Sequence, residues 1–168
     1  MSDMYCVYRG GKYKIKKRNG GYIIVSKESK AGFTKYVDVL GNEHDDFFMK
    51  YVSEHELECI YFEKHYIKYN NEYFSLFSSK ITRDMVLDDS FMIWTNSEQL
   101  AREHDFEKKE QFVFVKFIKR REIEAIKIVK KPLQSFEATG EFEEIIEGTE
   151  VDNYLDKLID DRDINYTN

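Results

Sequence analysis

The feature that most constrains the fold is an internal repeat, because a chain that repeats its sequence builds the same structural unit twice. Residues 50–60 match residues 116–126 without a gap, at an offset of 66. Residues 22–26 match residues 91–95 at an offset of 69. The blocks keep their order along the chain, and the changing offset indicates short insertions and deletions in the loops between them.

Two shorter blocks complete the repeat. Residues 10–13 match residues 70–73 at an offset of 60, and residues 31–33 match residues 104–106 at an offset of 73. The first block begins with Gly-Gly in one copy and with Asn-Asn in the other. Both residue types accept the positive φ of tight hairpin turns. We therefore predict a β-hairpin at the start of each copy.

Each copy is expected to hold five strands, with a single helical turn ahead of the last strand. Aromatic residues make up 15% of the chain and favour strands, because they pack well on a pleated sheet. The expected strands are residues 5–9, 12–17, 22–26, 47–52 and 58–63 in the first copy and 66–69, 72–77, 91–95, 112–118 and 124–129 in the second. The helical turns are expected at residues 53–57 and 119–123, and a short helix capped by Ser97 at residues 98–103.

Five short strands with one turn before the last strand are typical of an SH3-like barrel, in which closure of a small sheet removes exposed edges. We therefore predict a mainly β fold with two tandem SH3-like small barrels, residues 1–64 and 65–133. No turn residue interrupts residues 58–69, so one continuous strand is expected to join the two copies. A single larger sheet or sandwich of roughly ten strands is the alternative.

Residues 134–168 form an acidic tail with one expected helix. Residues 135–168 hold 11 acidic and 2 basic side chains, a local charge of −9, which leaves +3 on the rest of a chain of net charge −6. Thr149 and Asp152 have the spacing of a capping box. One helix face is apolar: Val151, Tyr154, Leu155, Leu158 and Ile159. This face is expected to dock on the barrels, and a detachable segment that binds a partner is the alternative.

Two groups of basic residues are candidate binding sites. Lys12, Lys14 and Lys16 alternate along one face of an expected strand that ends at Lys17 and Arg18. The second group is Lys116, Lys119, Arg120 and Arg121. Such groups, with tyrosines nearby, suit the phosphates and bases of nucleic acids. A solvated face is the default interpretation, and contact with the acidic tail is a further alternative.

No catalytic, cofactor or metal motif stands out, so we expect no cofactor and no metal. His44 and His104 each lie beside acidic residues, but they do not occupy matching positions of the repeat and lack the spacing of a helical zinc motif. His55 and Cys59 are four residues apart, yet a nucleophile would also need an orienting group and oxyanion donors. We interpret Cys59 as a buried residue of a strand and the histidines as loop residues.

The arrangement resembles tandem SH3-like-barrel proteins of bacteria and, more loosely, the small immunity proteins that neutralise toxins. The resemblance covers residues 1–131 and lies in the pattern around Gly32-Phe33 and in the repeated blocks 50–60 and 116–126. The second copy departs from it at Asp105, where the first has Gly32. The resemblance implies a fold and no binding residues.

Three functions remain open from the sequence. The first is a non-enzymatic protein-binding module, such as an immunity or inhibitor protein; the second is a nucleic-acid-binding module with an autoinhibitory acidic tail. The third is an enzyme or metal protein that uses the His/Asp clusters. The chain starts without a signal peptide and has no apolar run near the roughly 20 residues that cross a bilayer, so we expect a cytoplasmic protein without a membrane partner.

Overall fold

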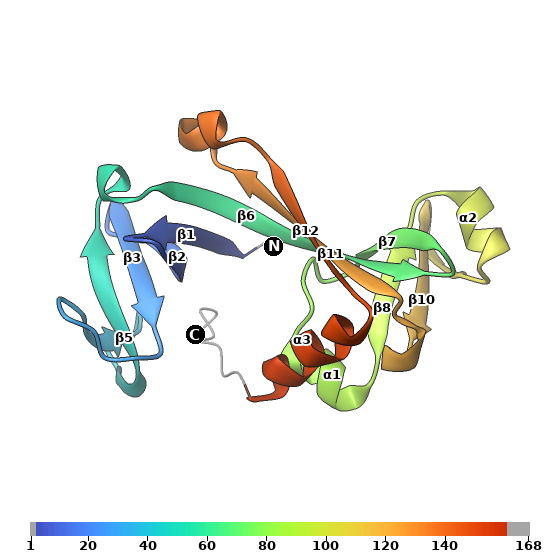
Figure 1. The fold of residues 1–168 in the computed structure, drawn as a ribbon, viewed down its shortest axis with the longest axis horizontal. Coiled ribbons are helices and arrows are strands. Elements are labelled where there is room, and N and C mark those ends of the chain that lie inside the picture. Colours follow the sequence, from blue (N-terminus) through green and yellow to red (C-terminus); the bar gives the residue numbers. More distant parts are fainter. Residues whose placement is uncertain (1–2, 161–168) are drawn as a thin grey trace. The chain divides into compact units, whose positions relative to one another are not determined.

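A computed structural model describes residues 3–160, which fold mainly as β-strands (Figure 1). The strands are β1 (Met4–Tyr8), β2 (Gly11–Arg18), β3 (Gly21–Ser26), β4 (Thr34–Val37), β5 (Glu43–Val52), β6 (Cys59–Tyr69), β7 (Glu72–Leu76), β8 (Phe91–Thr95), β9 (Glu107–Glu110), β10 (Val113–Ile118), β11 (Ala125–Pro132) and β12 (Phe142–Glu147). The helices are α1 (Arg83–Asp88), α2 (Glu98–Glu103) and α3 (Thr149–Asp160), and the 3-10 turns are η1 (Glu54–Glu56), η2 (Arg120–Glu122) and η3 (Gln134–Thr139). The mainly β class is confirmed.

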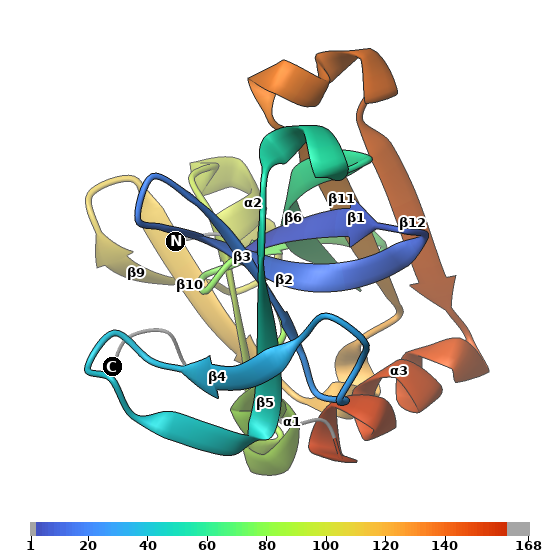
Figure 2. The same cartoon turned by 90° about the vertical axis from the view of Figure 1, so that its left-hand side faces the viewer.

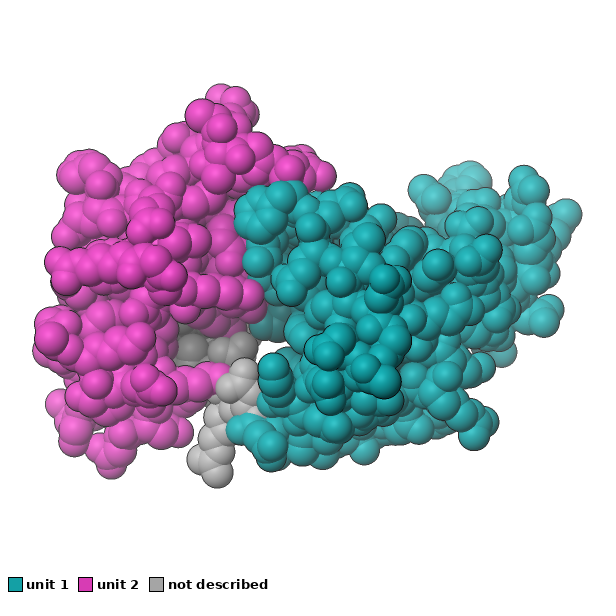
Figure 3. All heavy atoms as spheres, in the orientation of Figure 1, with its two compact units in different colours: residues 1–2, 63–130, 142–162 teal, residues 3–62, 131–141, 163–168 magenta. Residues whose placement is uncertain are grey.

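The strands form one open antiparallel sheet. Their order is β4-β5-β3-β2-β1-β6-β7-β8-β10-β9, with β11 beside β6 and β12 beside β11. The sheet spans two compact units, coloured separately in Figure 3. Unit 2 contains the first copy of the repeat, residues 3–62, together with residues 131–141; unit 1 contains residues 63–130 and 142–160. The predicted continuous strand is confirmed, because β6 runs from one unit into the other.

The repeat extends to the way the strands pair. In unit 2 Ile24 of β3 lies opposite Lys50 of β5, and in unit 1 Ile93 of β8 lies opposite Lys116 of β10. These partners are related by the sequence offsets of 69 and 66. The register also agrees for two further pairs of strands. The pair β2–β3 of unit 2 matches β7–β8 of unit 1, and β4–β5 matches β9–β10. The two copies therefore share both strand order and register.

The first hairpin corrects the predicted alignment by one residue. The turn of unit 2 is Arg9-Gly10 and not Gly10-Gly11, and the turn of unit 1 is Asn70-Asn71. All four residues have positive φ, between 47° and 76°, which is the conformation that the turn requires. The true offset is 61. A carboxylate supports each turn: Glu58 accepts from the Gly10 N–H at 2.9 Å, and Glu124 accepts from the Asn71 N–H at 3.1 Å.

Each copy has six strands and not the five predicted. The additional strands, β4 and β9, are short and carry charged, exposed side chains such as Lys35 and Lys108, so the apolar alternation that marks a strand is absent. Helix α1 and strand β12 were also missed. The predicted helical turns at η1 and η2 are confirmed, as is helix α2, whose Ser97 Oγ accepts from the Leu100 N–H at 3.2 Å.

Each unit has its own apolar core. In unit 2 it includes Tyr8, Ile24 and Ile60, and in unit 1 it includes Ile93 and Leu155. Helix α3 closes the unit 1 core with the apolar face that the sequence predicted, and Leu155 is fully buried. The predicted capping box is wrong, because Thr149 is the first residue of the helix and does not precede it.

Candidate functional site

The two units differ most on the outer face of the sheet, the face turned away from the apolar core that holds Ile24 or Ile93. In unit 2 this face has a second, smaller core. Its buried members are Ile23, Val25, Tyr36, Phe47 and Met49. Ile23 and Val25 come from β3, whereas Phe47 and Met49 come from β5. We call this set the covered face.

A long hairpin covers the outer face of unit 2. Twelve residues, 36–47, separate Lys35 from its cross-strand partner Phe48. They include the ends of β4 and β5, which lie side by side in Figure 2, and they carry Tyr36, which is only 2% exposed. Arg18 holds this ring: its guanidinium lies 5.4 Å from the ring centroid, and Nη2 donates to the Tyr36 hydroxyl at 3.3 Å.

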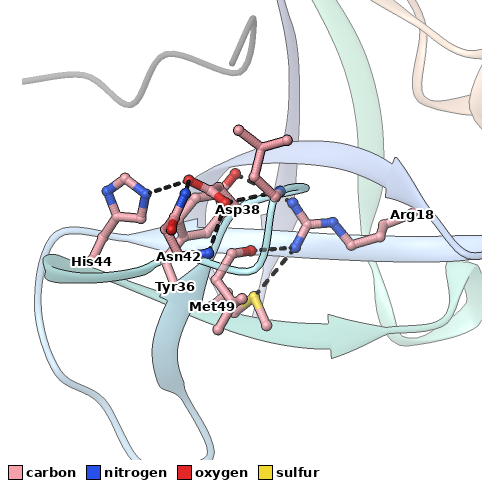
Figure 4. A network of polar contacts seen from close by, with 8 residues as sticks. Arg18, Tyr36, Asp38, Asn42, His44 and Met49 are labelled. Carbon is pink, nitrogen blue, oxygen red and sulfur yellow. Dashed lines mark hydrogen bonds and ion pairs between the residues drawn. The ribbon is translucent and has the colours of Figure 1, made fainter.

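A polar network fixes the turn of this hairpin (Figure 4). The Asp38 carboxylate accepts from the N–H groups of Leu40 and Asn42 at 2.9 Å each, and from His44 Nε2 at 3.1 Å. These hydrogen bonds, those from Asn42 and His44 foremost, lower the pKa of Asp38 from 3.8 to about 2. Arg18 Nη1 donates to the Val37 carbonyl at 2.6 Å. The hairpin that covers the face is thus itself held in place.

No hairpin of this length covers the matching face of unit 1 among residues 3–160. Only five residues, 109–113, separate Lys108 from its partner Phe114, so the hairpin is seven residues shorter than in unit 2. The cross-strand pairs Met92–Phe117 and Trp94–Val115 take the places of Ile23–Tyr51 and Val25–Met49. We call the following set the open face: Phe77, Met92, Trp94, Val113, Val115 and Phe117.

The open face presents large apolar side chains to solvent. Phe117 is 64% exposed and Phe77 is 42% exposed, and Phe112 in the short turn beside them is 69% exposed. Val115 is buried, and the pairing of Met92 with Phe117 and of Trp94 with Val115 makes these side chains neighbours. Apolar residues that adjoin one another on a surface in this way mark interaction sites, whereas isolated ones do not. Trp94, the single tryptophan of the chain, lies in the open face.

The first basic group is partly dispersed. Lys12, Lys14 and Lys16 lie on one face of β2 as predicted; Lys12 Nζ is 4.4 Å from the Tyr5 ring centroid and Lys14 is 3.7 Å from Asp3. Lys17 is exposed, but Arg18 turns inward to Tyr36. A polar hollow of about 470 Å³ lies at the β2–β3 turn, lined by residues 17–22 and Glu54.

The second basic group holds the tail, which is one of the alternatives left open by the sequence. Arg120 donates to the carboxylates of Asp152 and Asp156 on α3, at 2.8 Å each. These bonds raise the pKa of Arg120. Lys119 and Arg121, on either side, are exposed. Arg120 is therefore used within unit 1 and is not available to a ligand.

The predicted helix face is used for packing. Val151 and Leu155 are buried in the core of unit 1, and Tyr154, Leu158 and Ile159 pack against it. Phe142 and Ile145 of β12 remain exposed. Residues 161–168 of the acidic tail lie outside the described residues.

The histidine and cysteine candidates do not assemble into a catalytic or metal site among residues 3–160. His44 bonds to Asp38, and His104 lies against the rings of Tyr69 and Phe74 at 6.1 and 5.3 Å. Cys59 is buried in β6, whereas His55 is exposed in η1. No three His, Cys, Asp or Glu side chains in the described part of the chain gather as they would around a metal ion.

The open face was not identified from the sequence, although two signals bear on it. Residues 113, 115 and 117 alternate as apolar positions of one strand face. The repeat offset falls from 73 at Phe33 to 66 at Phe48, which locates an insertion of seven residues in the first copy. Neither signal shows that the inserted residues fold back over their own sheet, because that depends on tertiary packing.

The family described as "Uncharacterised conserved protein UCP033725" matches residues 1–135, a span that holds both copies of the repeat. No curated protein and no protein of solved structure matches the chain. No helix among the described residues is both long enough and apolar enough to cross a membrane.

Proposed function

The chain belongs to this family, and from its open face we propose that it is a non-enzymatic protein-binding module, an immunity or inhibitor protein that blocks an enzyme or toxin in the cytoplasm. The observation that carries the proposal is the exposure of Phe77 and Phe117 beside the half-buried Met92 and Trp94, whose equivalents in unit 2, Ile23 and Val25, are buried. Aromatic anchors of this kind dominate the binding energy of protein interfaces.

Unit 2 supports the proposal by showing what such a face requires when it has no partner. There the chain uses twelve residues, an inward arginine and a network around Asp38 to remove the layer from water. Burying apolar surface contributes about 25 cal/mol per Å², so an uncovered layer is a source of binding free energy. In unit 1 a partner supplies the cover.

We also propose that each unit is an SH3-like repeat. The two units have the same strand order, which is β4-β5-β3-β2-β1-β6 in unit 2 and β9-β10-β8-β7-β6-β11 in unit 1. In each unit a 3-10 turn precedes the last strand in the sequence, η1 in unit 2 and η2 in unit 1. A single 3-10 turn before the final strand supports an SH3-like arrangement. In this arrangement, partner binding uses the outer side of the sheet and leaves the core unchanged.

The test is affinity capture of a partner by the full chain, followed by reconstitution with the purified partner. Phe117→Lys is expected to weaken binding roughly tenfold or more, because it places a charge in the open face. Trp94 emission is expected to shift to shorter wavelength when the partner binds. Tyr51→Lys is the matched control, since Tyr51 is 54% exposed at the equivalent position of unit 2.

The outcome for the two variants decides the proposal. Loss of binding in Phe117→Lys, with Tyr51→Lys unchanged, supports it. Equal affinity of the wild type and Phe117→Lys, with no change in Trp94 emission, contradicts it. Circular dichroism of both variants establishes that each is folded before binding is compared.

A further inference from the structure

A second surface of unit 1 combines tyrosine rings with lysine ammonium groups. Tyr66 and Lys68 of β6 and Tyr73 of β7 lie on the side of the sheet opposite the buried Ile67 and Phe74. Lys68 pairs with Tyr73 across the two strands, so the tyrosines are diagonal neighbours. Two aromatic side chains therefore project from adjacent antiparallel strands.

Three lysines surround these rings. Lys127 of β11 lies 4.5 Å from the Tyr73 ring centroid and 5.1 Å from that of Tyr66. Lys64 lies 5.1 Å from the Tyr66 centroid, and Lys68 lies 5.8 Å from the Tyr73 centroid. The three lysines contact ring faces, and no carboxylate within residues 3–160 forms an ion pair with Lys64, Lys68 or Lys127.

The same positions in unit 2 lack this combination of charges. Asp3 stands where unit 1 has Lys64, and Val7 stands where it has Lys68. Asp3 also pairs with Lys14, at 3.7 Å. The first copy thus places an acidic residue beside its ring Tyr5, whereas the second keeps three positive charges beside its two rings.

Acidic residues of β12 border the surface on one side. Burial raises the pKa of Tyr73, and the charges of Glu147 and Glu143 raise it further. Both carboxylates are close enough to Tyr73 to act on its ring hydroxyl. Because they are negatively charged, these two carboxylates repel an anionic ligand and weaken its binding to the surface.

We propose that this surface binds single-stranded nucleic acid. Proteins that bind single strands combine positive charges that follow the phosphates with aromatic rings on which successive bases stack. Tyr66 and Tyr73 supply the rings, and Lys64, Lys68 and Lys127 supply the charges. The bases displace the lysine ammonium groups from the ring faces, and these groups then contact the phosphates. The surface lies on the same side of the sheet as the open face but shares no residue with it, so variants of the two surfaces test the two proposals separately.

The experiment is fluorescence anisotropy of labelled oligonucleotides of about 12 nucleotides, within the site sizes of single β-barrel domains, with the full chain at low salt. DNA and RNA single strands of one sequence, the corresponding duplex and heparin are the probes. Binding of the single strands is expected, stronger than that of the duplex and weakening as salt rises. Comparison of the DNA strand with the RNA strand shows which of the two nucleic acids the surface prefers.

Variants separate stacking from charge. Tyr73→Ala is expected to weaken binding of the single strands roughly tenfold, whereas Tyr73→Phe keeps the ring and the affinity. Lys127→Gln is expected to weaken binding and to reduce the dependence on salt by about one phosphate contact. Glu143→Gln together with Glu147→Gln is expected to strengthen binding. Lys108→Gln, at an exposed lysine of β9 outside the proposed surface, removes the same charge and is the control that leaves affinity unchanged.

Two results overturn the proposal. One is no change in anisotropy with either single strand at low salt. The other is binding that heparin, duplex and single strands share equally and that Tyr73→Ala does not alter, because this describes attraction of any polyanion. Unchanged circular dichroism and Trp94 emission of Tyr73→Ala exclude loss of fold as the cause of weaker binding.

Discussion

Val25 in unit 2 and Trp94 in unit 1 occupy the same position of the repeat, opposite Met49 and Val115. Val25 is buried in a small second core, whereas Trp94 lies in a layer that ends in the exposed Phe117. The strands beneath are paired identically. The two copies differ here by seven residues in one loop, and the difference teaches that an insertion in one copy of a repeat can help to turn an exposed apolar face into a core.

The covered face also shows that the insertion needs support from outside itself. Arg18 reaches the Tyr36 ring from the end of β2, whereas β7, its counterpart in unit 1, already ends at Leu76. The Asp38 network then fixes the turn. The cover therefore depends on changes in two separate segments of the first copy, and the second copy has neither.

The largest expected effect comes from moving the cover. Replacing residues 109–113 with residues 36–47 is expected to bury part of the open face. Trp94 emission should shift to shorter wavelength, and its quenching by acrylamide should fall. The same graft with alanine in place of Tyr36 should protect Trp94 less, because Tyr36 is the buried ring of the transferred hairpin. An unchanged Trp94 signal in a folded graft would show that the hairpin does not act as the cover.

Removing the central ring of the cover is the next largest change. Tyr36→Ala is expected to lower the free energy of unfolding by about 3 kcal/mol, because it leaves a cavity in a buried cluster. Phe117→Ala, in the open face, is expected to change it by less than about 0.5 kcal/mol. Urea denaturation of the full chain measures both. Similar losses in the two variants would remove the distinction between the faces.

The repeat itself predicts a matched pair of smaller effects. Glu58→Ala removes the carboxylate that accepts from Gly10, and Glu124→Ala removes the one that accepts from Asn71. Each is expected to lower the free energy of unfolding by about 1 kcal/mol. Chemical denaturation compares them. A loss in only one variant would show that the two turns are not supported in the same way.

The smallest expected effect is a pH dependence confined to unit 2. The pKa of Asp38 is lowered from 3.8 to about 2, so its contribution to stability is complete above pH 4 and is lost as the pH falls toward 2. Carboxyl carbon chemical shifts should give a midpoint near 2 for Asp38. Asp38→Asn should abolish this part of the acid dependence, and a midpoint near 3.8 would contradict the network.

Much of the fold could be predicted because pairing followed the repeat. The blocks around Ile24 and Lys50 recur around Ile93 and Lys116, and these residues prove to be cross-strand partners in each unit. Strands β4 and β9 could not be predicted, since charged side chains such as Lys35 and Lys108 give no apolar alternation. The hairpin turn was displaced by one residue because Arg9, unlike Gly11, gives no signal of positive φ.

The candidate site was harder to predict than the fold. The basic residues chosen from their spacing prove to have different roles: Arg18 supports a core and Arg120 holds α3. Spacing along a strand does not reveal which partner a long side chain finds in space. Likewise, the alternation of Val113, Val115 and Phe117 predicts a strand face, but only the fold shows that Phe117 is 64% exposed.

Hydroxyl-radical footprinting of the free full-length chain tests the difference between the covered face and the open face most directly, since it reports the solvent access of single side chains. The comparison uses residues of one type on the two faces: Phe117 with Phe47, and Met92 with Met49. We expect Phe117 and Met92 to be labelled and Phe47 and Met49 to be protected. Equal labelling within both pairs would contradict the assignment of one covered and one open face.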